Sequence, residues 1–145
     1  MIIFMDIPCG QKTIKNIHMK KLLTIFLLSI GLSLISFKYI EGLDNVINAL
    51  NEGNATEMGK YFDETVDISM PDKSDSYSKA QAVLILKDFF KNSGVKSFEV
   101  KHKGDNGNDL FCIGTLQTKT GNYRTTVFMR QKGSKQVVKE IRIQS

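Results

Sequence analysis

The chain has 145 residues, of which 41% are hydrophobic, and its 20 lysines and arginines exceed its 15 aspartates and glutamates by a formal net charge of +5. This length leaves room for one compact domain and excludes two. The charge is uneven, since residues 38–94 hold 10 acidic and 6 basic side chains whereas residues 95–145 hold 4 acidic and 10 basic ones.

A basic start followed by an apolar run stands near the N-terminus. Residues 19–21 read Met-Lys-Lys, and residues 22–35 contain no charge. This is the anatomy of a secretory signal peptide, and the run is shorter than the roughly 18 residues that a membrane span needs. Small side chains at Gly31 and Ser33 are typical of a cleavage site that would start the mature protein near Leu34, and Ser36 offers a weaker one that would start it near Phe37. We therefore expect a cleaved signal peptide at 19–36 and a mature domain at 37–145.

Residues 1–18 precede a signal peptide that is already complete, so we interpret them as an upstream extension with Met19 as the true start. A long n-region is the alternative. Removal of Cys9 with the leader leaves Cys112 alone, which excludes an internal disulfide. No cysteine directly follows the apolar run, so the mature protein is expected to be secreted, in the periplasm or outside the cell, without a lipid anchor.

Two short helices are predicted at the start of the mature domain. The first has apolar residues at i, i+3, i+4 and i+7, which form one stripe, and Gly53 can end it. Asn54 can then cap a second helix. The stripe consists of Leu43, Val46, Ile47 and Leu50, and the second helix has an apolar face of Met58, Tyr61 and Phe62.

The hydrophobic period changes to two from Glu64, where Val66, Ile68 and Met70 alternate with polar residues and predict a half-buried strand. Residues 72–76 are polar and are expected to form a loop. Ser78 and Gln81 then match a capping box that opens a long helix, and that helix is expected to end at Gly94.

Four alternating runs separated by glycine turns follow, and their short connections predict an antiparallel meander. In the first run, alternation places Phe98, Val100 and His102 on one face. Some of the strands are apolar on both faces, so we expect a partner subunit on the face away from the helices and a homodimer formed through the sheet. The four runs cover residues 96–103, 109–118, 123–131 and 136–143.

The predicted order α-α-β-α-β-β-β-β describes an α+β fold with helices packed on a curved antiparallel sheet. This order resembles the nuclear transport factor 2-like superfamily, whose cystatin-like fold is cone-shaped. Several blocks also resemble a family of small exported bacterial proteins catalogued as a domain of unknown function. The resemblance covers roughly residues 39–144, implies the fold and supplies no activity. The blocks are residues 48–55, 61–63, 78–82, 86–90 and 101–104.

Enzymes of this superfamily that resemble ketosteroid isomerase use carboxylates and a tyrosine inside the cone. The corresponding candidate pocket-lining residues are Tyr77, His102 and Tyr123, but none has a paired acid at a recognisable spacing. We therefore expect a non-enzymatic binding or assembly module for a small apolar ligand or a protein partner, with no catalytic residue named. The alternative is a small isomerase- or lyase-like enzyme whose active site lies in the cone.

Metal and nucleic acid are not expected as partners. His102 is flanked by two lysines, which is typical of a strand-end histidine hydrogen-bonded locally, and one histidine does not make a metal site. No cofactor is expected either. Basic residues interleave with Tyr123 and Phe128 in the second half, a mixture that single-stranded nucleic acid would require, but the expected export argues against it. The membrane is expected to be contacted only by the cleaved signal peptide.

Overall fold

The computed structural model describes residues 20–23, 25 and 41–145. Residues 20–23 and 25 are helical and belong to a unit separate from the one that contains residues 41–145. Within the described residues, no helix combines the length and the apolar character that crossing a membrane requires. The upstream extension at 1–18 and most of the expected signal peptide at 19–36, with its cleavage site, lie outside the described residues.

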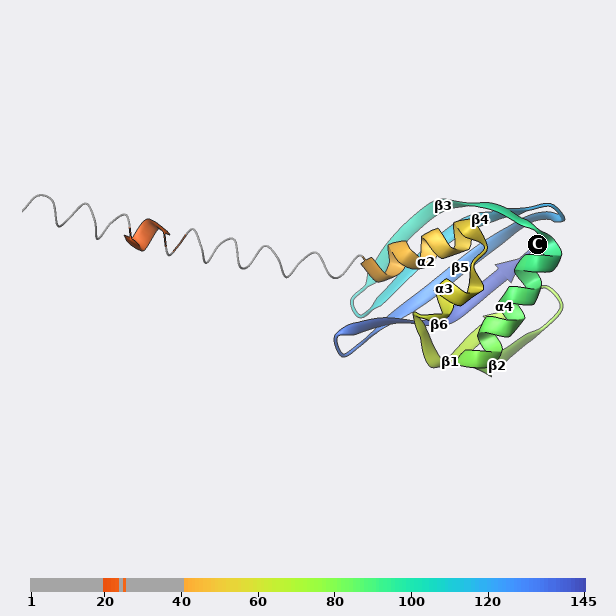
Figure 1. The fold of residues 1–145 in the computed structure, drawn as a ribbon, viewed down its shortest axis with the longest axis horizontal. Coiled ribbons are helices and arrows are strands. Elements are labelled where there is room, and N and C mark those ends of the chain that lie inside the picture. The colour runs from red at the N-terminus through yellow and green to blue at the C-terminus, as the bar shows by residue number, and fades with distance from the viewer. Residues whose placement is uncertain (1–19, 24, 26–40) are drawn as a thin grey trace, which may run out of the picture. The chain divides into compact units, whose positions relative to one another are not determined.

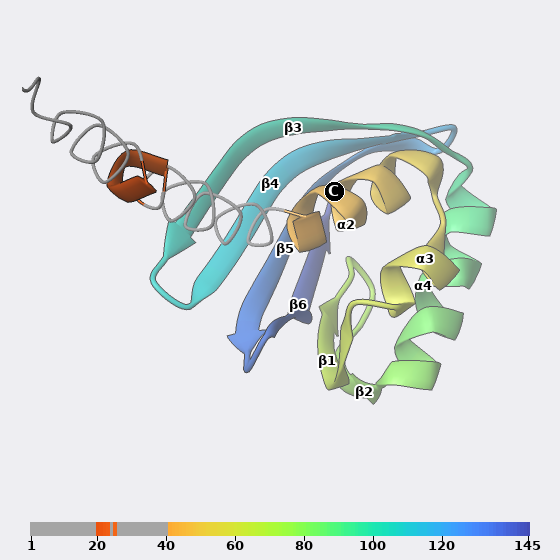
Figure 2. The same cartoon turned by 60° about the vertical axis from the view of Figure 1, so that its left-hand side comes forward.

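Residues 41–145 form a curved sheet with helices packed on one side of it (Figures 1 and 2). The sheet has the strand order β2-β1-β6-β5-β4-β3. The helices are α2 (Glu41–Glu52), α3 (Ala55–Gly59) and α4 (Lys79–Ser93), and the strands are β1 (Phe62–Ser69), β2 (Ser74–Ser78), β3 (Val95–Asn106), β4 (Asp109–Thr118), β5 (Gly121–Lys132) and β6 (Lys135–Gln144).

The helices α3 and α4 begin or end at the capping residues that the sequence predicts. The Asn54 side chain caps α3 by accepting a hydrogen bond from the Glu57 backbone N–H. Ser78 and Gln81 form a reciprocal capping box at the start of α4, and Gly94 ends that helix in the left-handed conformation at φ 68°. These three predicted boundaries are confirmed.

The prediction of a loop at residues 72–76 is wrong, because Ser74–Ser78 form β2, which pairs antiparallel with β1. Sequence patterning fails here because β2 lies at the sheet edge and is exposed at every position except the half-buried Tyr77. Backbone pairing with β1, rather than side-chain burial, therefore makes this segment a strand. The sheet is also mixed and not wholly antiparallel, since β1 runs parallel to β6.

Each strand of the meander has an inner face toward the helices and an outer face away from them. On β4, for example, the even-numbered Cys112, Gly114 and Leu116 are buried, while the odd-numbered residues are only half-buried. The inner faces and the helices share one hydrophobic core. Its largest fully buried side chains include Leu50, Met58, Ile68, Leu86, Leu116, Met129, Ile141 and Ile143.

The meander arches over α2, as Figure 2 shows, and two local features allow the bend. The register between β3 and β4 shifts between Val100 and His102, which makes Lys101 an extra residue in a β-bulge. On the inner face, the ring of Phe98 lies against Gly114, where a Cβ atom would come within 2.5 Å of the ring and of the Glu99 carbonyl oxygen. Gly114 is thus required for the close approach of β3 and its aromatic side chain.

A Gly114→Ala substitution is expected to destabilise the domain by about 1–3 kcal/mol, because neither the Glu99 carbonyl nor the Phe98 ring can move away without opening the β3–β4 pair. Urea unfolding followed by circular dichroism measures this. The control is Thr115→Ala at the next, outward-facing position. Equal stability of the two variants would contradict the close contact at Gly114.

Candidate functional site

The three residues predicted to line a pocket do not lie on one face of the sheet. Tyr77 on β2 pairs with Val66, and Tyr123 on β5 pairs with Leu116, so both tyrosines lie on the inner face and pack against the core. His102 is exposed and pairs with the outward-facing Ile113. The expectation that His102 shares a face with Phe98 is therefore wrong, because the bulge at Lys101 reverses the alternation of β3.

The two inner-face tyrosines make contacts that explain them as packing residues. The ring of Tyr123 meets Phe89 edge to face, with ring centroids 5.3 Å apart, and its hydroxyl lies 3.3 Å from the hydroxyl of Thr120. Within residues 41–145, no hydrogen bond joins Tyr77 or Tyr123 to a carboxylate. The arrangement thus lacks the acid that proton-transfer chemistry of the isomerase kind would require.

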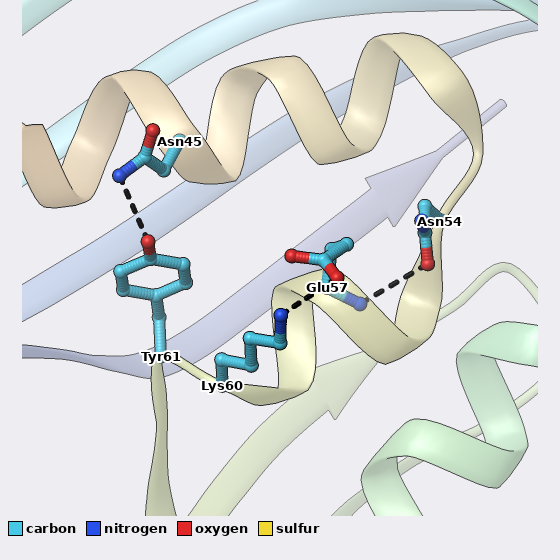
Figure 3. A network of polar contacts seen from close by, with 5 residues as sticks. All are labelled: Asn45, Asn54, Glu57, Lys60 and Tyr61. Carbon is cyan, nitrogen blue, oxygen red and sulfur yellow. Dashed lines mark hydrogen bonds and ion pairs between the residues drawn. The ribbon is translucent and has the colours of Figure 1, made fainter.

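A third tyrosine has a polar partner that the sequence did not reveal. The Asn45 side-chain amide donates a hydrogen bond of 2.8 Å to the Tyr61 hydroxyl, and Figure 3 shows this contact bridging α2 and the segment that leads into β1. The same view shows the Asn54 cap on α3 and the ion pair between Glu57 and Lys60. These contacts hold α2, α3 and the segment before β1 in position relative to one another.

Cys112 lies on the inner face and is fully buried, as expected of a small hydrophobic side chain. Burial raises the pKa of its thiol to about 11, an effect that nearby Lys103 opposes and Asp44 reinforces. The thiol is therefore protonated near neutral pH and is a poor nucleophile. Within the described residues, no cluster of three histidine, cysteine, aspartate or glutamate side chains could hold a metal ion.

The outer face of the sheet carries apolar side chains where polar ones are usual for an uncovered antiparallel sheet. These side chains are half-buried, and α2, α3 and α4 all lie on the opposite face (Figure 2). We call this group the outer patch, and it consists of Phe111, Ile113, Phe128 and Val137.

Aromatic contacts extend the outer patch into a continuous row across four strands. The His102 and Phe111 ring centroids lie 5.6 Å apart, and those of Phe111 and Phe128 lie 6.3 Å apart. The Arg142 guanidinium carbon lies 5.3 Å from the centroid of the Phe128 ring, and Arg142 also donates a hydrogen bond to Glu140. The row therefore runs from β3 to β6 and ends in an ion pair.

Charged side chains of both signs surround the outer patch. Asp109 accepts hydrogen bonds from Arg130 at 3.2 Å and from Lys139 at 3.3 Å, and the Arg130 contact first of all holds the pKa of Asp109 below its usual value. The outer face also carries the acids Asp67, Glu99 and Glu140 and the bases Arg124, Lys132, Lys135 and Arg142, and the Lys101 ammonium contacts Glu99.

The fold defined by these elements is that of the nuclear transport factor 2-like and cystatin-fold proteins. A solved protein of unknown function from Cytophaga hutchinsonii, described as NTF2-like, shares it at a TM-score of 0.54 and 13% identity, over 70% of this chain and 84% of that one. The expected α+β fold with helices on a curved sheet is thus confirmed.

Residues 43–144 match the family described as a domain of unknown function, DUF4783, and the chain belongs to that family. A solved DUF4783 protein from Bacteroides uniformis is 38% identical with a TM-score of 0.68, over 70% of this chain and 94% of that one. One from Bacteroides ovatus is 31% identical with the same TM-score, over 70% and 92%. No curated protein matches the sequence. The resemblance stated from the sequence is confirmed.

Two hydrogen bonds favour the ionised form of Asp63, at the start of β1. It accepts hydrogen bonds from the Lys132 ammonium at 2.9 Å and from the Glu64 backbone N–H at 2.8 Å. These two contacts, with Lys132 as the larger cause, lower the pKa of Asp63. A carboxyl whose pKa is lower in the folded chain stabilises the fold above its unfolded pKa of about 3.9 and loses that contribution as the pH falls through the folded value.

An Asp63→Asn variant is accordingly expected to be less stable than the natural chain near neutral pH. The difference in free energy of unfolding should shrink as the pH falls from about 5 toward about 2. Urea unfolding at a series of pH values measures this, and Asp72→Asn in the exposed turn after β1 is the control. A difference that stays constant over this range would contradict the lowered pKa of Asp63.

Alkylation of Cys112 by iodoacetamide at pH 8 is expected to be roughly 100-fold slower, or more, in the folded chain than in denaturing urea, because burial withholds the thiolate. A Cys9→Ser background removes the other thiol. Mass spectrometry of the quenched reaction gives the rates. Equal rates in the two conditions would mean that Cys112 is accessible and reactive in the fold.

Proposed function

We propose that this protein is an exported, non-catalytic binding module that contacts a protein partner through the outer patch. The observation that supports this most directly is the row of aromatic side chains on β3, β4 and β5, which Arg142 of β6 extends, on the face without helices. Aromatic side chains and arginine are the residues most enriched at the energetic centres of protein interfaces.

The packing of side chains inside the cone supports the outer face of the sheet as the binding surface. A small apolar ligand or a substrate would need space on the inner face, but that face is lined by fully buried aliphatic and methionine side chains, among them Leu116, Val127 and Met129. Among the candidate residues, Tyr77 and Tyr123 lie there without a carboxylate partner in residues 41–145. Both the ligand-in-the-cone hypothesis and the enzyme hypothesis are weaker for these reasons.

The two sheet edges are also unfavourable for binding. On β3, the Phe98 backbone N–H donates to the Asn51 side chain at 2.9 Å, and on β2 the Ser76 and Ser78 N–H groups donate to Asp75 and Gln81 side chains. A peptide that adds a strand needs such N–H groups free. The bulge at Lys101 disturbs the β3 edge further. A partner is therefore better accommodated on the outer face.

Native mass spectrometry of the chain purified gently from the cells that produce it tests the proposal. We expect a complex heavier than the single chain by the mass of a protein, and a Phe128→Asp substitution should weaken it by about 30-fold or more, as for a residue at the centre of an interface. Tyr123→Phe, on the inner face, is the control and should leave the complex intact.

A bound small molecule that disappears in Tyr77→Phe or Tyr123→Phe, with no protein partner present, would overturn the proposal. That result would favour the enzyme or ligand-binding hypothesis, because it would place the site in the cone.

A further inference from the structure

We infer that Asn106, at the rim of the outer face, is a site of spontaneous modification, where the side-chain amide is converted to an acid without an enzyme. The products are aspartate and isoaspartate, and water is the only reactant besides the chain. This inference goes beyond the proposed function, because it concerns the turn that joins β3 to β4 and holds for any partner. Three properties of the turn carry it: the residue that follows Asn106, the hydrogen bonding of the two reacting groups, and the exposure of the turn.

The residue after Asn106 is Gly107, and no other asparagine in the sequence precedes a glycine. Conversion begins when the next backbone nitrogen attacks the carbonyl carbon of the asparagine side chain. Most side chains hinder that attack by their own backbone nitrogen, whereas glycine has no side chain. Gly107 has a φ of 74°, and a Cβ atom placed there would have no other atom within 4 Å. The space around the attacking nitrogen is therefore open.

Hydrogen bonds hold the side chains of other asparagines in the domain but not that of Asn106. The Asn45 amide donates to a tyrosine hydroxyl, and the Asn51 side chain accepts from a backbone N–H of β3. Within the described part of the domain, by contrast, no hydrogen bond holds the Asn106 side chain or the Gly107 backbone N–H. Neither reacting group therefore has to give up a partner before the two can meet.

The turn lies at the free end of the β3–β4 hairpin, away from α3 and α4 (Figure 2). Residues 105–108 are all exposed, and the last pair of the strand ladder joins Asn106 to Asp109. Exposed loops and chain ends open locally at little cost in free energy. Asn106 can therefore leave its extended conformation and reach Gly107 without any opening of the core.

The reaction has two steps. The Gly107 nitrogen attacks the side-chain carbonyl carbon of Asn106, so that a new carbon–nitrogen bond forms and the bond to the amide nitrogen breaks. Ammonia leaves with the proton that the Gly107 nitrogen gives up, and a five-membered imide remains. Water then opens the imide at one of its two carbonyl carbons, which yields aspartate in one case and isoaspartate in the other.

The new acid at position 106 changes the rim of the outer face. It lies directly opposite Asp109, which already pairs with Arg130 and Lys139. Like charges directly opposite each other destabilise a strand pair. Isoaspartate also adds one atom to the main chain, so the pair with Asp109 loses its spacing. The conversion therefore weakens the end of the hairpin and makes the outer face more acidic as the chain ages.

Peptide mapping of the purified chain tests the inference. The chain is kept for several days in neutral buffer at the growth temperature of the cells that produce it, and samples are digested with trypsin at intervals. Mass spectrometry with fragmentation identifies the converted residue, and a sample digested before incubation gives the conversion that digestion itself causes. Asn122 is the matched control, since it is also exposed near a turn but is followed by Tyr123.

Asn106 is expected to convert at least roughly 10-fold faster than Asn122, with aspartate and isoaspartate both formed, because glycine leaves the attacking nitrogen unhindered. Asn106→Gln should remove these products, since glutamine would have to close a larger ring. Conversion of Asn106 no faster than that of Asn122 would overturn the inference. So would products that form in Asn106→Gln as fast as in the natural chain. Either result leaves the proposed function standing, because the experiment contains no partner.

Urea unfolding of two variants measures the effect of the new charge without waiting for conversion. Asn106→Asp should unfold at a lower urea concentration than Asn106→Gln in low salt, because its carboxylate faces Asp109. The difference should shrink in high salt, which screens the repulsion. Equal midpoints for the two variants in low salt would overturn the expected effect on the hairpin.

Discussion

The close approach of β3 to β4 is the constraint on which the rest of the structure depends. The Phe98 ring can lie against β4 only because Gly114 has no side chain, and the bulge at Lys101 adds the extra twist. Asn51 on α2 accepts a hydrogen bond from the Phe98 N–H and so ties the bent strand to the helix beneath it. Without this bend the meander could not arch over α2 and enclose the core.

The same bulge determines which polar groups lie on each face of β3. After the extra residue at Lys101, His102 turns outward to stack beside Phe111, while Lys103 turns toward the helices and forms an ion pair of 2.6 Å with Asp44 on α2. One irregularity in the backbone thus strengthens the contact of the strand with α2 and also begins the aromatic row of the outer face. The ion pair with α2 and the start of the aromatic row are thus consequences of a single local feature.

The elements that could be predicted from the sequence are those whose own residues form a recognisable local pattern. The Ser78–Gln81 capping box and the alternation of Val66 and Ile68 need no distant partner. The strand β2 has no such local pattern, because Tyr77 is its only half-buried residue. Its strand conformation depends on backbone pairing with β1. The bulge at Lys101 likewise depends on how β3 meets β4, so the face of His102 could not be predicted.

The candidate interface was predictable only in outline. Apolar residues on both faces of the strands indicated a partner, but the contact between Phe111 and Phe128 depends on the register of β4 with β5. The closest match to enzyme chemistry, a tyrosine with a polar partner, is Tyr61, whose hydroxyl accepts from Asn45 and thereby joins α2 to β1. Because that hydrogen bond joins α2 to the segment that leads into β1, a change that freed the Tyr61 hydroxyl for catalysis would loosen the fold, whereas the outer patch lies on the face of the sheet opposite the helices.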